Sequence, residues 1–112
     1  MTQQNNIQQN TNVDFEERKK GCAIRFSKNK IALYNFFDGM AQSNPEYYKV
    51  MRAMNFAEKA HAGYRKDKVT PEFHHQVEIC LYLRTISSNF MNPIEVFILA
   101  LLHDTYEDYP HL

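Results

Sequence analysis

The chain has 112 residues, 44% of them hydrophobic, which is enough apolar surface to build the core of one domain. Its thirteen basic and thirteen acidic residues cancel, so the overall charge gives no attraction to nucleic acid or to an anionic membrane. Any affinity for phosphate must therefore come from a local group of basic residues.

The amino-terminal residues lack the basic and apolar stretches of a signal peptide, and the longest apolar run, 96–102, is too short to cross a bilayer. Cys22 and Cys80 lie far apart, in no metal-binding spacing. We interpret both as small buried side chains in a reducing compartment. We therefore expect a soluble, cytoplasmic protein.

Residues 1–13 hold four glutamines and four asparagines, no charge and few apolar side chains, which predicts a disordered polar tail. Apolar residues return over 15–39, where Ile24 and Ile31 can share one face of a helix. We therefore expect a helical extension over 14–44, followed by a domain over 45–112.

Two start signals predict the next helices. Residues 44–46, Asn-Pro-Glu, precede apolar residues at helical spacing, which place His61 on the inward face and offer Gly63 as a left-handed stop. Residues 70–72, Thr-Pro-Glu, repeat this signal before a helical pattern that ends at the polar residues 87–89.

A further helix is predicted after residues 92–95, Asn-Pro-Ile-Glu, which can form a capping box. Residues 96–102 are apolar on nearly every side, so we expect other helices to surround them. This helix would deliver His103 and Asp104 to a protected site. Because no alternating pattern of strands competes, we predict an all-α fold.

The segment 101–108 puts one imidazole and three carboxylates within six residues after that apolar stretch. Buried charges are costly unless they are paired or bind a metal, so we expect a divalent cation there. His103 and Asp104 would hold it with His75, for which His74 is the competing choice. Mixed nitrogen and oxygen donors favour manganese or iron over calcium.

Hydrolysis of a phosphate ester is the chemistry that this segment suggests. On a continuing helix Glu107 would share a face with His103 and Asp104, where it could orient or deprotonate a water, with Asp108 as its helper. Arg65 and Lys66 lie in a short basic loop that could bind phosphate oxygens. We interpret His61 as a supporting histidine rather than a ligand.

Several of these residues form an ordered series of separated motifs, spread over residues 50 to 110. The series resembles the hydrolase domain of the RelA/SpoT alarmone enzymes and of their small stand-alone relatives, which belong to the HD superfamily of helical, metal-dependent phosphohydrolases. It comprises Phe56-Ala57, Ala60-His61-x-Gly63, Arg65-Lys66, Pro71, His75 and Ala100-Leu101-Leu102-His103-Asp104-Thr105-x-Glu107-Asp108.

The resemblance implies a manganese ion held by His75, His103 and Asp104, and its spacing from Pro71 selects His75 over His74. It implies that Glu107 and Asp108 are the catalytic acidic pair. The residues matching its substrate-phosphate contacts are Arg65 and Lys66. The implied reaction removes the 3′-pyrophosphate of guanosine tetra- or pentaphosphate; related small enzymes also act on NADPH.

The chain departs from the family at Gln76, where the family has proline after histidine, and at Glu72, where it has tyrosine after proline. The family's fourth ligand is an aspartate in a later helix, and the sequence ends at Leu112 without it. We therefore expect a partial HD-type bundle, truncated at its carboxyl end. Its uncovered apolar surface would favour self-association.

Two alternatives stay open at this point. A catalytically inactive helical module could keep the fold and bind a nucleotide or a partner without turnover. An HD nucleotidase could act on a different nucleotide.

Overall fold

The computed structural model describes the backbone of residues 2–108 and the side chains of 13–105, 107 and 108. The elements are α1 (Thr2–Ser43), α2 (Tyr47–Ala60), α3 (His74–Arg84), the short 3-10 helix η1 (Ser87–Asn89) and α4 (Pro93–Asp108). Within 2–108 the backbone pairing outside helices and turns is one isolated bridge, between Tyr64 and Pro71, and there is no strand. The prediction of an all-α fold is confirmed.

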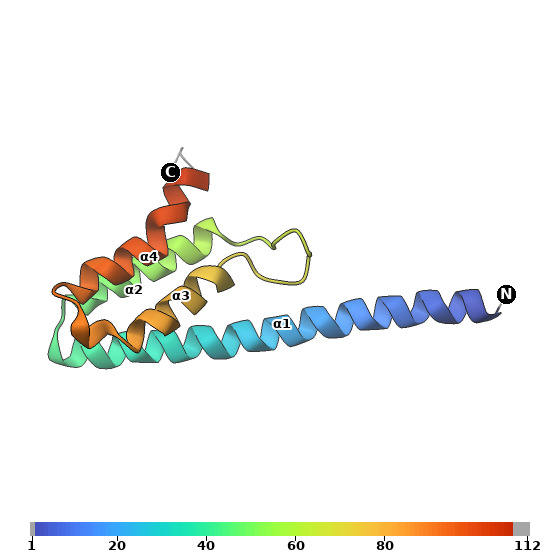
Figure 1. Ribbon diagram of the computed structural model, residues 1–112, viewed down its shortest axis with the longest axis horizontal. Helices are drawn as coiled ribbons and strands as arrows, with labels where there is room; N and C mark the ends of the chain where they lie inside the picture. The colour runs from blue at the N-terminus through green and yellow to red at the C-terminus, as the bar shows by residue number, and fades with distance from the viewer. Residues whose placement is uncertain (1, 109–112) are drawn as a thin grey trace.

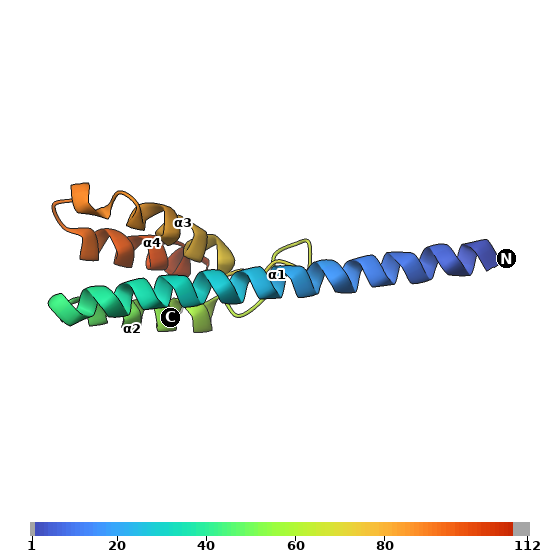
Figure 2. The same ribbon diagram turned by 90° about the horizontal axis from the view of Figure 1, so that it is seen from below.

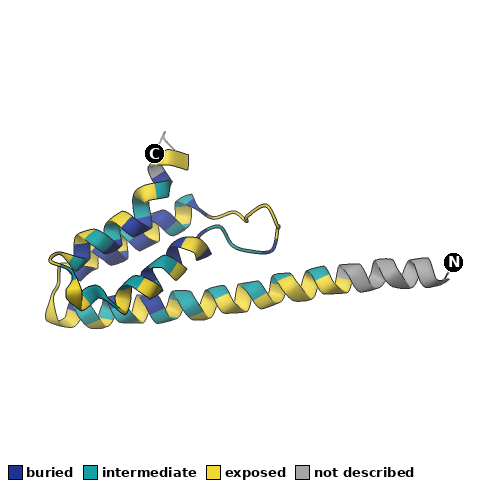
Figure 3. Ribbon diagram, in the orientation of Figure 1, coloured by how far each residue is buried: buried dark blue, intermediate teal, exposed yellow. Residues whose placement is uncertain are grey.

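Helix α1 is a long rod, and the other helices pack beside its carboxyl-terminal half (Figures 1 and 2). Both α2 and α3 contact α1, and α4 lies across α2 and α3. Buried residues gather where these helices face one another (Figure 3). Along α1 the first buried side chain after residue 13 is Leu33, and the partly buried Phe26 before it also packs against the core.

Phe97 of α4 is the centre of the core. Its ring lies edge-on to Phe37 with 5.0 Å between centroids and to Phe36 at 5.9 Å, and the ring of Tyr47 lies 6.5 Å away. One aromatic side chain therefore joins α4 to both α1 and α2.

The two cysteines differ in their surroundings. Burial raises the pKa of the Cys80 thiol to about 12, which keeps it neutral, whereas Cys22 is partly exposed on α1.

The amino-terminal segment differs from its prediction. Helix α1 starts at Thr2 and so includes the residues for which the composition predicts a disordered tail. The first glycine is Gly21 and the first proline is Pro45, so no strong helix breaker interrupts the early residues. The helix stops at Ser43, since a proline disfavours the helical conformation of the residue before it. Because Leu33 and Phe37 belong to the common core, this half of α1 is part of the bundle.

The predicted starts of α2 and α4 agree with the structure. Asn44 Oδ1 accepts a hydrogen bond of 3.1 Å from the amide of Glu46, and Asn92 Oδ1 accepts one of 3.3 Å from the amide of Glu95. The left-handed stop at Gly63 is wrong. Helix α2 ends at Ala60, no glycine in 2–108 has a positive φ, and the residue that does is Lys68, at 66°.

The expectation that other helices surround the apolar part of α4 is also wrong. Leu99 is 67% exposed, and it lines a shallow apolar cavity of about 320 Å³ with Ile98, Leu102, Glu95 and His103. Within residues 2–108 the other helices cover only one side of α4.

The described part of the chain holds no helix with both the length and the apolar character that a membrane crossing requires.

We expect Phe97→Ala to lower the free energy of unfolding by about 3–5 kcal/mol, because it empties the aromatic contact that joins three helices. Leu99→Ala, on the same helix but exposed, should change it by no more than about 0.5 kcal/mol. Urea denaturation followed by circular dichroism measures both. Equal losses for the two variants would contradict this assignment of the core.

Candidate functional site

An open cavity of about 290 Å³ lies where the end of α2, the start of α3 and the last turns of α4 meet. Four of its lining residues are site residues predicted from the sequence: Arg65, His75, Asp104 and Asp108. The other three are His61, Glu72 and Gln76. The structure therefore brings a histidine, two carboxylates and a guanidinium together from segments that are far apart in the sequence.

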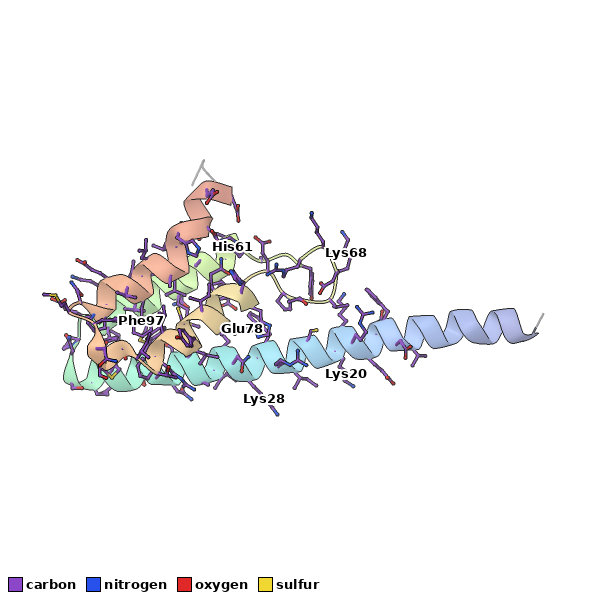
Figure 4. The ribbon with its side chains drawn as sticks, viewed as in Figure 1. Lys20, Lys28, His61, Lys68, Glu78 and Phe97 are labelled. Atoms are coloured by element: carbon purple, nitrogen blue, oxygen red, sulfur yellow. The ribbon has the colours of Figure 1, made fainter. Side chains whose placement is uncertain are left out.

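His61 connects the segments around this cavity. Its side chain is 1% exposed; Nδ1 lies 2.6 Å from Glu72 Oε1, and Nε2 lies 3.0 Å from Thr105 Oγ1. Figure 4 shows His61 beside α4, at the junction of α2 and the loop that follows it. As expected for a supporting histidine, both ring nitrogens have protein partners.

Because Thr105 belongs to α4, its contact with His61 also positions the acidic residues of that helix. The Thr105 side chain is fully buried, and it lies between Asp104 and Asp108 in the sequence. Residues four apart on a helix lie on the same face, one turn from each other. The bond between Thr105 and His61 therefore holds α4 in the rotation that aims Asp104 and Asp108 at the cavity.

The two adjacent histidines His74 and His75 face different surroundings. His74 is buried against α1, where Asn29 Nδ2 donates to its Nε2 over 3.0 Å and the ring of Phe26 packs edge-on. His75 is exposed and lines the cavity. Successive helical residues point about 100° apart, so only one of the two can face the cavity.

His103 does not line the cavity. Its Nδ1 donates to the carbonyl of Ala100 over 3.1 Å, and its ring lies at the edge of the exposed apolar face of α4. It touches the site only through Asp104, because its Nε2 lies 3.1 Å from Asp104 Oδ1. The cavity that His75 lines therefore does not include His103 among its lining residues.

Only one residue of the predicted acidic pair lines this cavity, and the same is true of the predicted basic pair. Asp108 and Glu107 are both exposed, but of the two only Asp108 lines the cavity. Arg65 lines the cavity, whereas Lys66 lines an adjoining open cavity of about 520 Å³. Arg65 and Glu72 border both cavities, which therefore lie next to each other.

The loop between α2 and α3 brings Arg65 and Glu72 to the same cavity through a short antiparallel pairing of its two ends. The amide of Arg65 donates to the carbonyl of Thr70 over 2.9 Å, and the amide of Glu72 donates to that of Gly63 over 2.9 Å. Asp67 closes the tip of the loop, because its carboxylate accepts bonds from the amides of Val69 and Thr70 and from the Thr70 hydroxyl.

Sequence reasoning noted Glu72 in a helix start signal and as a departure from a family pattern, and Gln76 only as a departure. It assigned neither of them to the site and gave no role to Thr105. Gln76 is 2% exposed, and among the described residues its Oε1 atom has no hydrogen-bond partner. A signal was available, because position 76 lies on the face of α3 that buries Phe73 and Cys80. A polar side chain at such a buried position indicates that it has a hydrogen-bonding role there.

Comparisons with family models, with curated proteins and with solved structures gave no match for this chain. The interpretation of the cavity therefore depends on its own residues and geometry.

Thr105→Val should lower the free energy of unfolding by about 1–3 kcal/mol, because it removes the hydroxyl partner of a buried imidazole and keeps the shape of the side chain. Thr105→Ser keeps the hydroxyl and should lose less. Thermal or urea denaturation distinguishes them. A valine variant as stable as the serine variant would show that the bond does not hold α4.

The pKa of Asp67 is lowered from 3.8 to about 2, first by the Thr70 hydroxyl and then by the amides of Thr70 and Val69. Because the folded value is below the unfolded one, the ionised group stabilises the loop above about pH 4, and this is lost as the pH falls through about 2. Thr70→Val should raise the pKa toward 3.8, measured by NMR titration of the carboxyl carbon. Thr85→Val, which removes a remote hydroxyl, should leave it unchanged; a Thr70→Val value still near 2 would contradict the assignment.

Proposed function

We propose that this chain is a metal-dependent phosphohydrolase of the HD type that removes pyrophosphate from a nucleotide such as guanosine tetraphosphate. The observation that supports the proposal is the single cavity that His75, Asp104, Asp108 and Arg65 share. It combines nitrogen and oxygen donors for a divalent cation with a guanidinium for phosphate oxygens.

The donors in the cavity fit manganese. His75 and Asp104 supply imidazole nitrogen and carboxylate oxygen, which suit manganese better than calcium. In the proposal His103 completes the set, since its Nε2 is already 3.1 Å from Asp104 Oδ1 and both atoms can serve one ion. Such a cation supplies Lewis-acid polarisation of a phosphoryl oxygen.

The other residues have roles that follow from their charge and position. Arg65 binds non-bridging phosphate oxygens through paired N–H donors, and Lys66 extends this positive edge into the adjoining cavity, which accommodates more of the nucleotide. Asp108 accepts a proton from the attacking water, and Glu107 supports it from the adjacent position. His61 and Thr105 position these carboxylates through their mutual hydrogen bond.

A nucleotide-binding module without turnover is the second candidate. The observation that favours it is the orientation of His103, whose ring lies on the outer face of α4 rather than in the cavity. Such a module would bind the same phosphates through Arg65 and would lack hydrolysis.

The test measures pyrophosphate release from guanosine tetraphosphate by the full chain with Mn²⁺. Asp108→Asn should lower the rate by about 10²–10⁴-fold, because the amide cannot accept the proton, and His75→Ala should weaken Mn²⁺ binding. Asp14→Asn, the same substitution at an exposed position of α1, is the control and should keep the rate.

Three outcomes count against the proposal in different ways. Release that survives Asp108→Asn would remove the role given to this residue. Nucleotide binding without release would favour the module, and release from other nucleotides alone would favour an HD nucleotidase with another substrate.

A further inference from the structure

The cavity holds a second set of donors beside His75 and Asp104. One ligand atom each from His61, Glu72 and Asp108 can be chosen so that all three lie within 4.8 Å of one another. They come from the end of α2, the loop before α3 and the last turn of α4. Three donors from three segments that meet at one point can surround a small cation.

The charges that line the cavity are unbalanced. Glu72, Asp104 and Asp108 contribute three carboxylates, and Arg65 is the cationic side chain among the lining residues. The Glu72 and Asp104 side chains are only 27% and 30% exposed, so water screens them incompletely. Added positive charge is therefore favourable in this cavity.

The contact between His61 and Glu72 places two possible metal ligands side by side. At 2.6 Å, His61 Nδ1 and Glu72 Oε1 are joined by a hydrogen bond, and a cation that binds both atoms would replace its hydrogen. Thr105 Oγ1, 3.0 Å from the other nitrogen, can accept a proton from Nε2. That tautomer leaves Nδ1 as a donor toward a cation.

Gln76 gives an independent indication of a ligand. Gln76 lines the same cavity and is only 2% exposed. In the described part of the chain its Oε1 atom has no hydrogen-bond partner. A buried acceptor without a partner is unfavourable, so a ligand that donates a hydrogen bond is expected beside it. The hydration water of a cation is such a donor.

We propose that this cavity takes a second divalent cation, held by His61, Glu72 and Asp108, with Gln76 Oε1 accepting a hydrogen bond from its hydration water. One nitrogen and two carboxylate donors suit Mn²⁺. The proposal deepens the proposed function and rests on it for the first cation, at His75 and Asp104. Two adjacent cations would clamp a phosphate group from both sides, which a single ion cannot do.

The experiment measures how many Mn²⁺ ions the full chain binds, by equilibrium dialysis with elemental analysis. We expect two per chain in the wild type. Glu72→Gln keeps the shape and a hydrogen-bonding group beside His61 but removes the charge, and it should weaken one ion at least about tenfold. Glu46→Gln, the same change at an exposed position, should keep both ions.

A second measurement needs no variant and so does not depend on how the variants fold. Two Mn²⁺ ions in one cavity couple magnetically, so the electron paramagnetic resonance signal of the wild type should lose intensity when the second equivalent binds. Two uncoupled ions would overturn the proposal.

The outcomes separate this proposal from the proposed function. One ion that Glu72→Gln retains and His75→Ala loses overturns the second site and leaves the first. One ion that His75→Ala retains and Glu72→Gln loses supports the site at Glu72 and counts against the site at His75. Two ions that persist in Glu72→Gln overturn the second site, and a chain that binds no Mn²⁺ overturns both.

Discussion

The buried imidazole of His61, bonded to Glu72 on one side and to Thr105 on the other, is the interaction on which the site depends. A buried polar group that loses its partner is costly, so both partners are held in place. Thr105 sets the rotation of α4, and Glu72 ties the loop to the end of α2. Through the pairing of that loop, Arg65 is brought to the same cavity.

The rotation of α4 that serves the cavity also exposes side chains on the opposite face of the helix. Turning Asp104 and Asp108 toward the cavity turns His103 and Leu99 toward solvent, because a helix gives each residue a fixed direction. The same helix therefore carries acidic donors on one side and an uncovered apolar surface on the other. Only the side that includes Phe97 is buried by α1, α2 and α3.

The two positions at which the chain departs from the family it resembles both line the cavity. Glu72 adds a carboxylate and a partner for His61, and Gln76 adds a buried acceptor. These departures enlarge the set of polar donors around the cavity. This is why the proposed second cation site involves Glu72 and Gln76, for which the family pattern gave no role.

The sequence by itself predicted the helices that follow Asn44 and the starts of α2 and α4, because caps, prolines and apolar spacing act within a few residues of one another. It also predicted a set of site residues, of which His75, Asp104, Asp108 and Arg65 share one cavity. Only the tertiary structure decided that His61 joins Glu72 to Thr105 and that His103 faces outward. Those outcomes depend on how α4 rotates against α2, which long-range packing sets and no local pattern encodes.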